Sequence, residues 1–250
     1  MWSASFLLLL VALSGAGLYD LAGKSLHRHL PLILAFGGAF LIGIIFNHLV
    51  PETYAMGSNA GLFVLIGFTF QGLLEYLSQG IEHGHVHVHE SHSKSPSVPW
   101  GIVISLCLHA FIESMPLTEA AGHAHEGHSH AVAWSDLNAA LLIGLVLHKF
   151  PVALVLMGMM HALGLDRVKR WIIILVFGLM PMLGMLAYEG LVHSSATWAG
   201  EVPLVAGGVL IGILLHISTT ILFETGDGHH FNRNKLLVTL AGLGLAILAT

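Results

Sequence analysis

Long apolar runs separated by short polar connections dominate the chain. A run of about 18 or more apolar residues is long enough to cross the hydrocarbon core of a bilayer as a helix. Seven such runs and a shorter one at the C-terminus occupy residues 2–21, 30–50, 61–79, 100–120, 137–163, 171–190, 202–223 and 236–250. The pattern predicts an all-α integral membrane protein, a bundle of eight transmembrane helices that forms a single domain over residues 1–250.

The first run has the length of a secretory signal and contains small residues at 14–17. A signal peptide carries positive charge ahead of its apolar stretch, and this chain has none there. We therefore predict that residues 2–21 are retained as a transmembrane helix.

The basic residues test the predicted connections. Eight of the nine lie after odd-numbered spans, and the connections after even-numbered spans contain none: Lys24, Arg28, Lys94, Arg167, Lys169, Arg170, Arg233 and Lys235. Because basic connections stay in the cytoplasm, both termini are predicted to lie outside the cytoplasm. We expect the protein in the cytoplasmic (inner) membrane or the plasma membrane.

The composition agrees with a membrane protein and narrows its partners. Hydrophobic residues make up 55% of the chain, and charged residues only 9%, against roughly 25% in soluble domains. The net charge of −5 indicates no nucleic-acid partner. Cys107 is the single cysteine, which excludes an internal disulfide and a thiolate metal cluster. The 19 histidines are unusually many and indicate metal chemistry.

Ionisable side chains near mid-membrane depth form the main candidate site. His109 and Glu113 are four residues apart and share one face of the fourth span. His148 lies at a similar depth in the fifth span, which runs in the opposite direction. Imidazole and carboxylate ligands suit Zn²⁺, Fe²⁺ or Mn²⁺, so these three residues are predicted metal ligands. The alternative is that they are polar contacts between helices.

Lys149 directly follows His148 and lies at the same depth. A lone ammonium at this depth is costly, so we predict that Glu113 is its charge partner. Prolines at 116, 151 and 181 are predicted to interrupt the fourth, fifth and sixth spans.

Other polar residues at the ends of spans are candidates for the pathway. His48 and Glu52 lie four residues apart at the outer end of the second span, where they form either an entrance or a wetted helix end. Glu75, His216 and Glu224 lie toward the inner ends of their spans, where they serve an exit or are simply solvated.

Two connections are rich in histidine. Residues 82–98 contain alternating histidines and are predicted to be cytoplasmic, and residues 122–134 form a second such loop outside. Alternating histidines on an irregular backbone bind metals loosely, so we expect each loop to act as a metal buffer.

Several segments resemble the ZIP family of zinc and iron transporters. Residues 109–113 read His-Ala-Phe-Ile-Glu and resemble the family's His-Asn-x-Pro-Glu element, and 148–152, His-Lys-Phe-Pro-Val, resemble its partner on the next span. The glycine-rich stretch that ends in His-Leu-Val-Pro-Glu at 48–52 is also similar, as are Gly67 and Glu75 in the third span. The resemblance implies a ZIP-like bundle that moves divalent metal into the cytoplasm by alternating access.

This chain departs from the family pattern at several positions. Ile112 stands where the family has proline, and Ala110, Lys149 and Val152 stand where many members carry ligands for a second metal. We therefore expect one metal, with the Lys149 ammonium in place of the second cation.

The sequence thus predicts a divalent metal transporter rather than an enzyme. Zn²⁺ is the expected cargo, with Fe²⁺, Mn²⁺ and Cd²⁺ as alternatives, and no cofactor is expected. The expected partners are the metal ion and the lipid bilayer, with a homodimer as the candidate assembly. The rival interpretations are a metal exporter of another fold, an intramembrane metal-dependent hydrolase and a metal-sensing receptor.

Overall fold

The computed structural model describes residues 2–22, 30–78, 98–117, 134–223 and 233–249, and all regular structure in these ranges is helical. The α-helices are α1 (Trp2–Ala22), α2 (Leu30–Ile44), α3 (Val50–Met56), α4 (Ala60–Ser78), α5 (Trp100–Glu113), α6 (Trp134–Ala162), α7 (Arg167–Val192), α8 (Val202–Phe223) and α9 (Arg233–Leu248). A π-helical turn, Ile45–Leu49, joins α2 to α3, and a 3₁₀ turn, Ala199–Glu201, leads into α8. The all-α prediction is confirmed.

Six helical segments are long and apolar enough to cross a membrane. They are Trp2–Leu21, Leu30–Met56, Ala60–Ser78, Ala139–Ala162, Arg167–Val192 and Ala199–Leu222. The helices α5 and α9 have 14 and 16 residues and are shorter than the roughly 20 residues that a span requires. The chain is therefore a multi-pass membrane protein, while the count of eight spans and the outside termini stay predictions.

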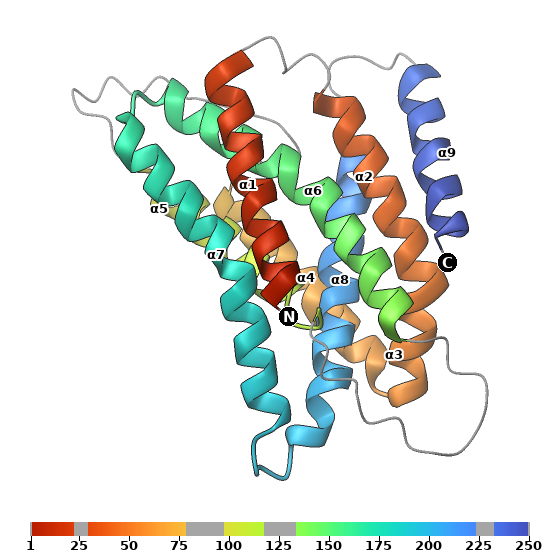
Figure 1. Cartoon of the computed structure of the whole chain (residues 1–250). Helices are drawn as coiled ribbons and strands as arrows, with labels where there is room; N and C mark the ends of the chain where they lie inside the picture. The colour runs from red at the N-terminus through yellow and green to blue at the C-terminus, as the bar shows by residue number, and fades with distance from the viewer. Residues whose placement is uncertain (1, 23–29, 79–97, 118–133, 224–232, 250) are drawn as a thin grey trace.

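The helix α6 occupies the centre of the bundle (Figure 1). Residues 151–160 are buried on every side, as expected for a helix surrounded by other helices. The second half of α6 packs in a core with α1, α5 and α7, and its first half packs in another core with α2 and α8. Side chains from α6 thus reach both cores.

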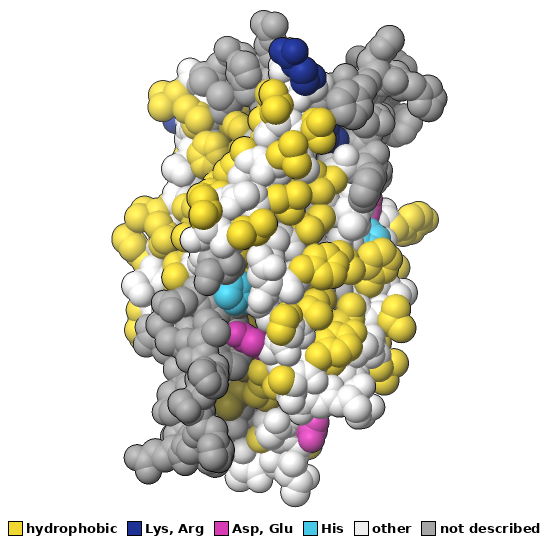
Figure 2. Space-filling model, turned by 90° about the vertical axis from the view of Figure 1, so that its right-hand side faces the viewer, with side chains coloured by type: hydrophobic (Ala, Val, Ile, Leu, Met, Phe, Trp, Pro, Cys, Tyr) yellow, Lys and Arg dark blue, Asp and Glu magenta, His cyan; other side chains and the backbone are white. Residues whose placement is uncertain are grey.

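Five of the six described basic residues gather at one end of the bundle. The C-terminal end of α1, the junction of α6 with α7 and the start of α9 lie together at the top of Figure 1. Arg167, Lys169, Arg170, Arg233 and Lys235 all belong to the helices that start there, and Lys and Arg side chains lie near the upper end of the face in Figure 2. Lys24, Arg28 and Lys94 lie outside the described residues. The positive-inside rule predicts that this end faces the cytoplasm.

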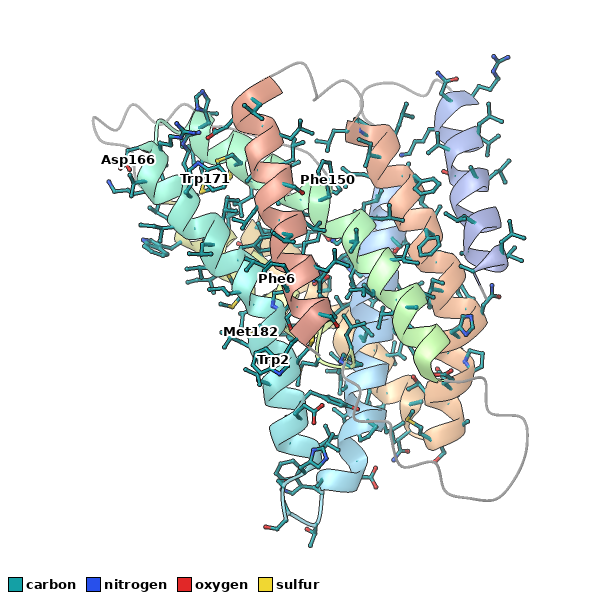
Figure 3. The ribbon with its side chains drawn as sticks, in the orientation of Figure 1. Trp2, Phe6, Phe150, Asp166, Trp171 and Met182 are labelled. Carbon is teal, nitrogen blue, oxygen red and sulfur yellow. The ribbon has the colours of Figure 1, made fainter. Side chains whose placement is uncertain are left out.

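At the same end, α7 begins with a side-chain cap. Asp166 accepts a hydrogen bond at 2.9 Å from the backbone N–H of Lys169. This bond holds the pKa of the Asp166 carboxyl below its usual value. Asp166 and Trp171 are both labelled in this part of Figure 3, where Trp171 lies beside the upper half of α1. The cap and the contact with α1 fix how α7 enters the bundle.

Two predicted spans differ from the observed helices. The second continues to Met56 through the π-helical turn, so His48 lies within the helical segment and not near its end. The prediction that the fourth span is helical to residue 120 is wrong, because α5 ends at Glu113. Pro116 lies in the following turn, since proline has no N–H to donate to the Ile112 carbonyl. The Met115 N–H donates to that carbonyl instead.

Glycines allow α4 and α8 to pack closely. A Cβ atom on Gly67 would overlap the Val209 carbonyl, and one on Gly212 would overlap the Val64 carbonyl. Small residues at such contacts let helix backbones approach each other within a membrane.

The variant Gly212→Ala should therefore be less stable than the wild type, by about 1–3 kcal/mol, because the added methyl group forces the two helices apart. The control is Gly244→Ala on α9, where a Cβ would have nothing within 4 Å. That control should be neutral or slightly stabilising, because alanine is the better helix former. Thermal unfolding in detergent measures both variants, and equal effects would contradict this account of the α4–α8 contact.

Candidate metal centre

Two neighbouring helices bring three predicted ligands together. His109 and Glu113 project from α5, and His148 projects from α6. One ligand atom from each residue lies within 4.8 Å of the other two. The side chains are nearly inaccessible, with 1%, 2% and 3% of their residue surfaces exposed. We call these three residues the His–Glu–His group.

The geometry within the group suits a small cation. His109 Nε2 lies 3.0 Å from Glu113 Oε2, and the rings of His109 and His148 are 5.7 Å apart at an interplanar angle of 84°. Ligand atoms around a tetrahedral zinc ion are separated by roughly 3.4 Å, given metal–ligand distances of about 2.1 Å. A bound zinc ion would therefore move His109 Nε2 and Glu113 Oε2 slightly apart and draw in those ligand atoms of the group that lie farther apart, up to 4.8 Å.

Lys149 completes the charge of the group. Its ammonium lies 3.2 Å from Glu113 Oε1 and 4.5 Å from the centre of the Phe177 ring. Only 1% of the lysine surface is exposed. The predicted pairing of Lys149 with Glu113 is confirmed. The two carboxylate oxygens thus have separate partners, because Oε1 faces the ammonium and Oε2 faces His109.

Contacts with α7 fix the end of α5. Ser114, which follows Glu113, donates to the carbonyls of Ala110 and Pro181 and so ties the end of α5 to α7. Gly184 of α7 lets this end approach, because a Cβ there would overlap the Phe111 carbonyl. The position of Glu113 therefore depends on α7 as well as on its own helix.

Pro151 lies within α6, close to His148 and to Phe150, which Figure 3 labels near the middle of the bundle. Proline leaves the carbonyl of Leu147 without its usual helical partner. This carbonyl packs against Gly37 of α2, where a Cβ would lie 3.4 Å away. The freed carbonyl is therefore directed toward α2, which favours a kink and helix contact over a further metal ligand.

The predicted entrance residues lie apart from the His–Glu–His group. His48 is buried in the π-helical turn, and its Nε2 has no hydrogen-bond partner among the described residues. Glu52 is half-buried and lines a small cavity of about 40 Å³ that also borders Thr53, Tyr188 and Pro116. Because Pro116 follows α5 by three residues, this cavity lies next to the helix end that carries Glu113.

Two of the three predicted exit residues form a pair that the sequence did not reveal. His216 Nε2 of α8 lies 2.5 Å from Glu75 Oε2 of α4, and the Phe68 ring packs edge-on against the imidazole at 4.6 Å. Both side chains are partly exposed. Glu224 lies outside the described residues, and so do the histidine loops at 82–98 and 122–134 except for their edges at Val98 and Trp134.

Comparison with known proteins adds independent information. No protein-family model matches the chain. Over 180 residues the chain is 27% identical to zinc transporter ZIP9-B of Xenopus laevis, which covers 70% of the chain and 56% of that protein. It is 26% identical over 183 residues to zinc transporter ZIP9 of Xenopus tropicalis, covering 72% and 57%. Zinc transporter ZIP9 of Micropogonias undulatus is 26% identical over 174 residues, covering 68% and 53%. The chain therefore spans a little more than half the length of these relatives.

Proposed function

We propose that the protein is a ZIP-family transporter that carries a divalent transition-metal ion, zinc above all, across a bilayer toward the cytoplasm. The observation that carries the proposal is the buried His–Glu–His group, which joins the shorter apolar helix α5 to α6, a helix long and apolar enough to cross a membrane. The similarity to zinc transporters of the ZIP9 type supports it. Placing an ionisable side chain at membrane depth costs at least about 2.5–3.5 kcal/mol. Apolar side chains would pack the helices without this cost, so the ionisable groups are better explained by metal binding than by a structural role.

The group is suited to a metal in transit. Two imidazoles and one carboxylate replace part of the water shell that the ion loses. Nitrogen and oxygen ligands of this kind suit Zn²⁺. Lys149 removes the net negative charge of Glu113, so the site holds the ion less tightly than an unpaired carboxylate would. We propose that a single metal binds, with the ammonium in place of a second cation, and that alternating access exposes the site to each side in turn.

The metal pathway is proposed to use the other polar residues. His48 and Glu52 serve the outer side, the Glu75–His216 pair serves the cytoplasmic side, and Glu224 extends the exit. The two histidine loops are proposed to buffer metal on either side of the membrane. We further propose eight spans with outside termini, a homodimer in the inner or plasma membrane, and no enzymatic activity.

The variant Glu75→Gln tests the proposed exit. It should slow zinc influx several-fold, because a neutral amide attracts the departing cation less than a carboxylate does. Zinc affinity at the His–Glu–His group should be unchanged. The matched control is Glu189→Gln. Glu189 lies on α7 and, like Glu75, is a carboxylate paired with a histidine, here His193. If both variants transport like the wild type, Glu75 has no part in the pathway.

The proposed function is tested by zinc influx into proteoliposomes that contain a trapped fluorescent zinc indicator. Wild-type protein should raise the rate above that of protein-free liposomes when zinc is added outside. If zinc does not cross under a gradient in either direction, the transport proposal fails and the hydrolase interpretation gains. Metal movement that occurs only out of the compartment equivalent to the cytoplasm would instead indicate an exporter.

A further inference from the structure

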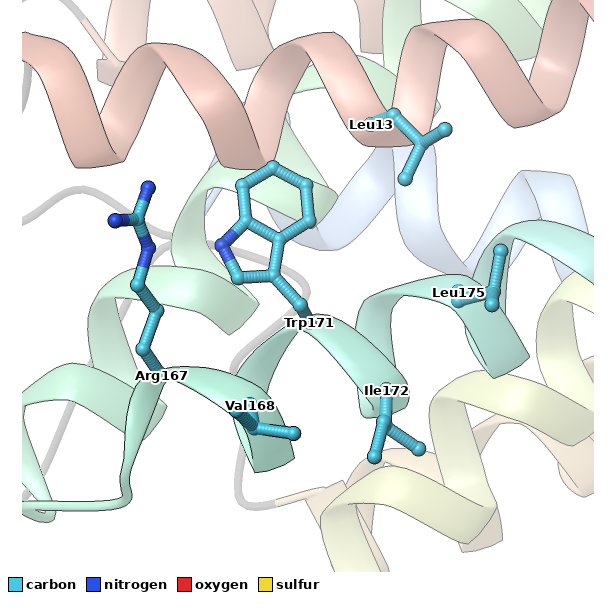
Figure 4. Close-up of a pocket in the computed structure, with 6 residues that line it drawn as sticks. All are labelled: Leu13, Arg167, Val168, Trp171, Ile172 and Leu175. Carbon is cyan, nitrogen blue, oxygen red and sulfur yellow. The ribbon is translucent and has the colours of Figure 1, made fainter.

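An apolar groove runs between α1 and α7 on the outside of the bundle. Its lining is Leu13 from α1 and Arg167, Val168, Trp171, Ile172 and Leu175 from α7, and its volume is about 430 Å³. We call it the α1–α7 groove. Figure 4 shows the guanidinium of Arg167 and the indole of Trp171 both reaching from α7 toward α1, with Leu13 and Leu175 farther along. The groove thus has a cationic end and an apolar length.

The cationic end carries more positive than negative charge. The Asp20 carboxylate forms ion pairs with Arg170 at 3.3 Å and with Arg167 Nε at 3.4 Å. It also accepts a hydrogen bond from the indole N–H of Trp171 at 3.1 Å. One carboxylate therefore serves two guanidinium groups. The nearby pair of Lys169 with Asp166 at 3.0 Å is balanced in charge. The neighbourhood retains a net charge of about +1, which the described side chains leave uncompensated.

Arg167 is the accessible part of this cluster. Its side chain is 73% exposed, whereas that of Arg170 is only 10% exposed. Arg167 uses Nε for Asp20, and its two terminal nitrogens make no hydrogen bond within the part of the chain that the structure describes. A guanidinium in this state presents paired donors suited to the oxygens of a phosphate.

The position of the groove matches a membrane interface. Arg167 lies at the end of the bundle where the basic residues gather, and the apolar lining continues from there along two membrane-crossing helices. Tryptophan favours this depth because its indole is apolar and also donates a hydrogen bond. Cytoplasmic leaflets are rich in anionic lipids, so the cationic end is predicted to face them.

We propose that the α1–α7 groove binds an anionic phospholipid. One acyl chain lies along Leu13, Ile172 and Leu175, and the phosphate contacts the terminal nitrogens of Arg167. The Arg167 guanidinium, which is the charged group in the groove lining, selects an anionic headgroup over a zwitterionic one, because it would repel the cationic amine of phosphatidylcholine. The assignment stands apart from metal transport, since none of the lining residues belongs to the His–Glu–His group.

Tryptophan quenching by brominated lipids tests the proposal in reconstituted full-length protein. The difference in fluorescence between the wild type and Trp171→Phe gives the signal of Trp171. The quenching of this signal is compared between brominated phosphatidylglycerol and brominated phosphatidylcholine. Wild type should prefer phosphatidylglycerol by about fivefold. Arg167→Gln should remove this preference, while Lys169→Gln, which deletes the same charge from an exposed lysine outside the groove lining, should retain it.

A second variant probes the apolar length of the groove. Leu13→Phe fills the space without changing charge, and it should reduce quenching of Trp171 by both lipids. If Arg167→Gln does not fold, this variant decides the question. No lipid preference in the wild type, equal losses in Arg167→Gln and Lys169→Gln, or full quenching in Leu13→Phe would each overturn the proposal.

Discussion

The variant Glu113→Gln should lower the initial rate of zinc influx into proteoliposomes by about a hundredfold or more. The substitution keeps the shape of the side chain but removes the only anionic ligand of the His–Glu–His group. It also leaves the Lys149 ammonium, 3.2 Å away and 1% exposed, without its counter-ion. An approaching Zn²⁺ would then meet two neutral imidazoles and an unbalanced positive charge.

The control for this variant is Glu201→Gln. Glu201 is exposed in the 3₁₀ turn before α8, where it lines a cavity with Ile112 and Met115 but is not one of the three ligands. The Glu201→Gln variant should transport zinc at the wild-type rate. Equal rates in Glu113→Gln and wild type would show that Glu113 is not a ligand, even if the protein proves to be a transporter.

The variant Lys149→Met should destabilise the metal-free protein by about 3–5 kcal/mol, because it leaves Glu113 as an unpaired buried charge. Methionine approximates the length of the lysine stem, so the loss is mainly electrostatic. Zinc should restore much of this loss, since the bound cation then compensates the carboxylate. The zinc-induced rise in unfolding temperature should thus be larger for the variant than for the wild type.

Lys235→Met is the matched control. Lys235 is partly exposed at the start of α9, where its ammonium donates to the Ile221 carbonyl. This variant should lose little stability, and zinc should raise its unfolding temperature as much as it does for the wild type. If Lys149→Met is as stable as wild type without metal, Lys149 does not act as the compensating charge.

The hydrophobic pattern predicted most of the helical architecture, because helices that cross a bilayer must be long and apolar. Each predicted apolar run is helical over most of its described residues. The ends of the helices were less predictable. An apolar sequence continues past Glu113 to residue 117, but the missing N–H of Pro116 and the bonds of Ser114 end α5 earlier. Such ends depend on a neighbouring helix, which periodicity does not encode.

The candidate site was predictable from two features of the sequence: the spacing of its residues within one span and their predicted position near the middle of the membrane. His109 and Glu113 share a face by their four-residue spacing, and a ligand atom of His148 on α6 lies within 4.8 Å of theirs. The partner of Lys149 followed from the cost of an unpaired ammonium. In contrast, the contact of Glu75 with His216 joins α4 to α8. Nothing in the spacing of two distant helices indicates which of their faces pack together.

Anomalous diffraction at the zinc absorption edge, from crystals of the zinc-loaded protein, tests the central claim most directly. We expect a single zinc peak among His109, Glu113 and His148, about 2.0–2.2 Å from one ligand atom of each, and no second peak beside Lys149. Zinc bound elsewhere with none among these three residues would contradict the account, and so would a second ion in contact with Glu113.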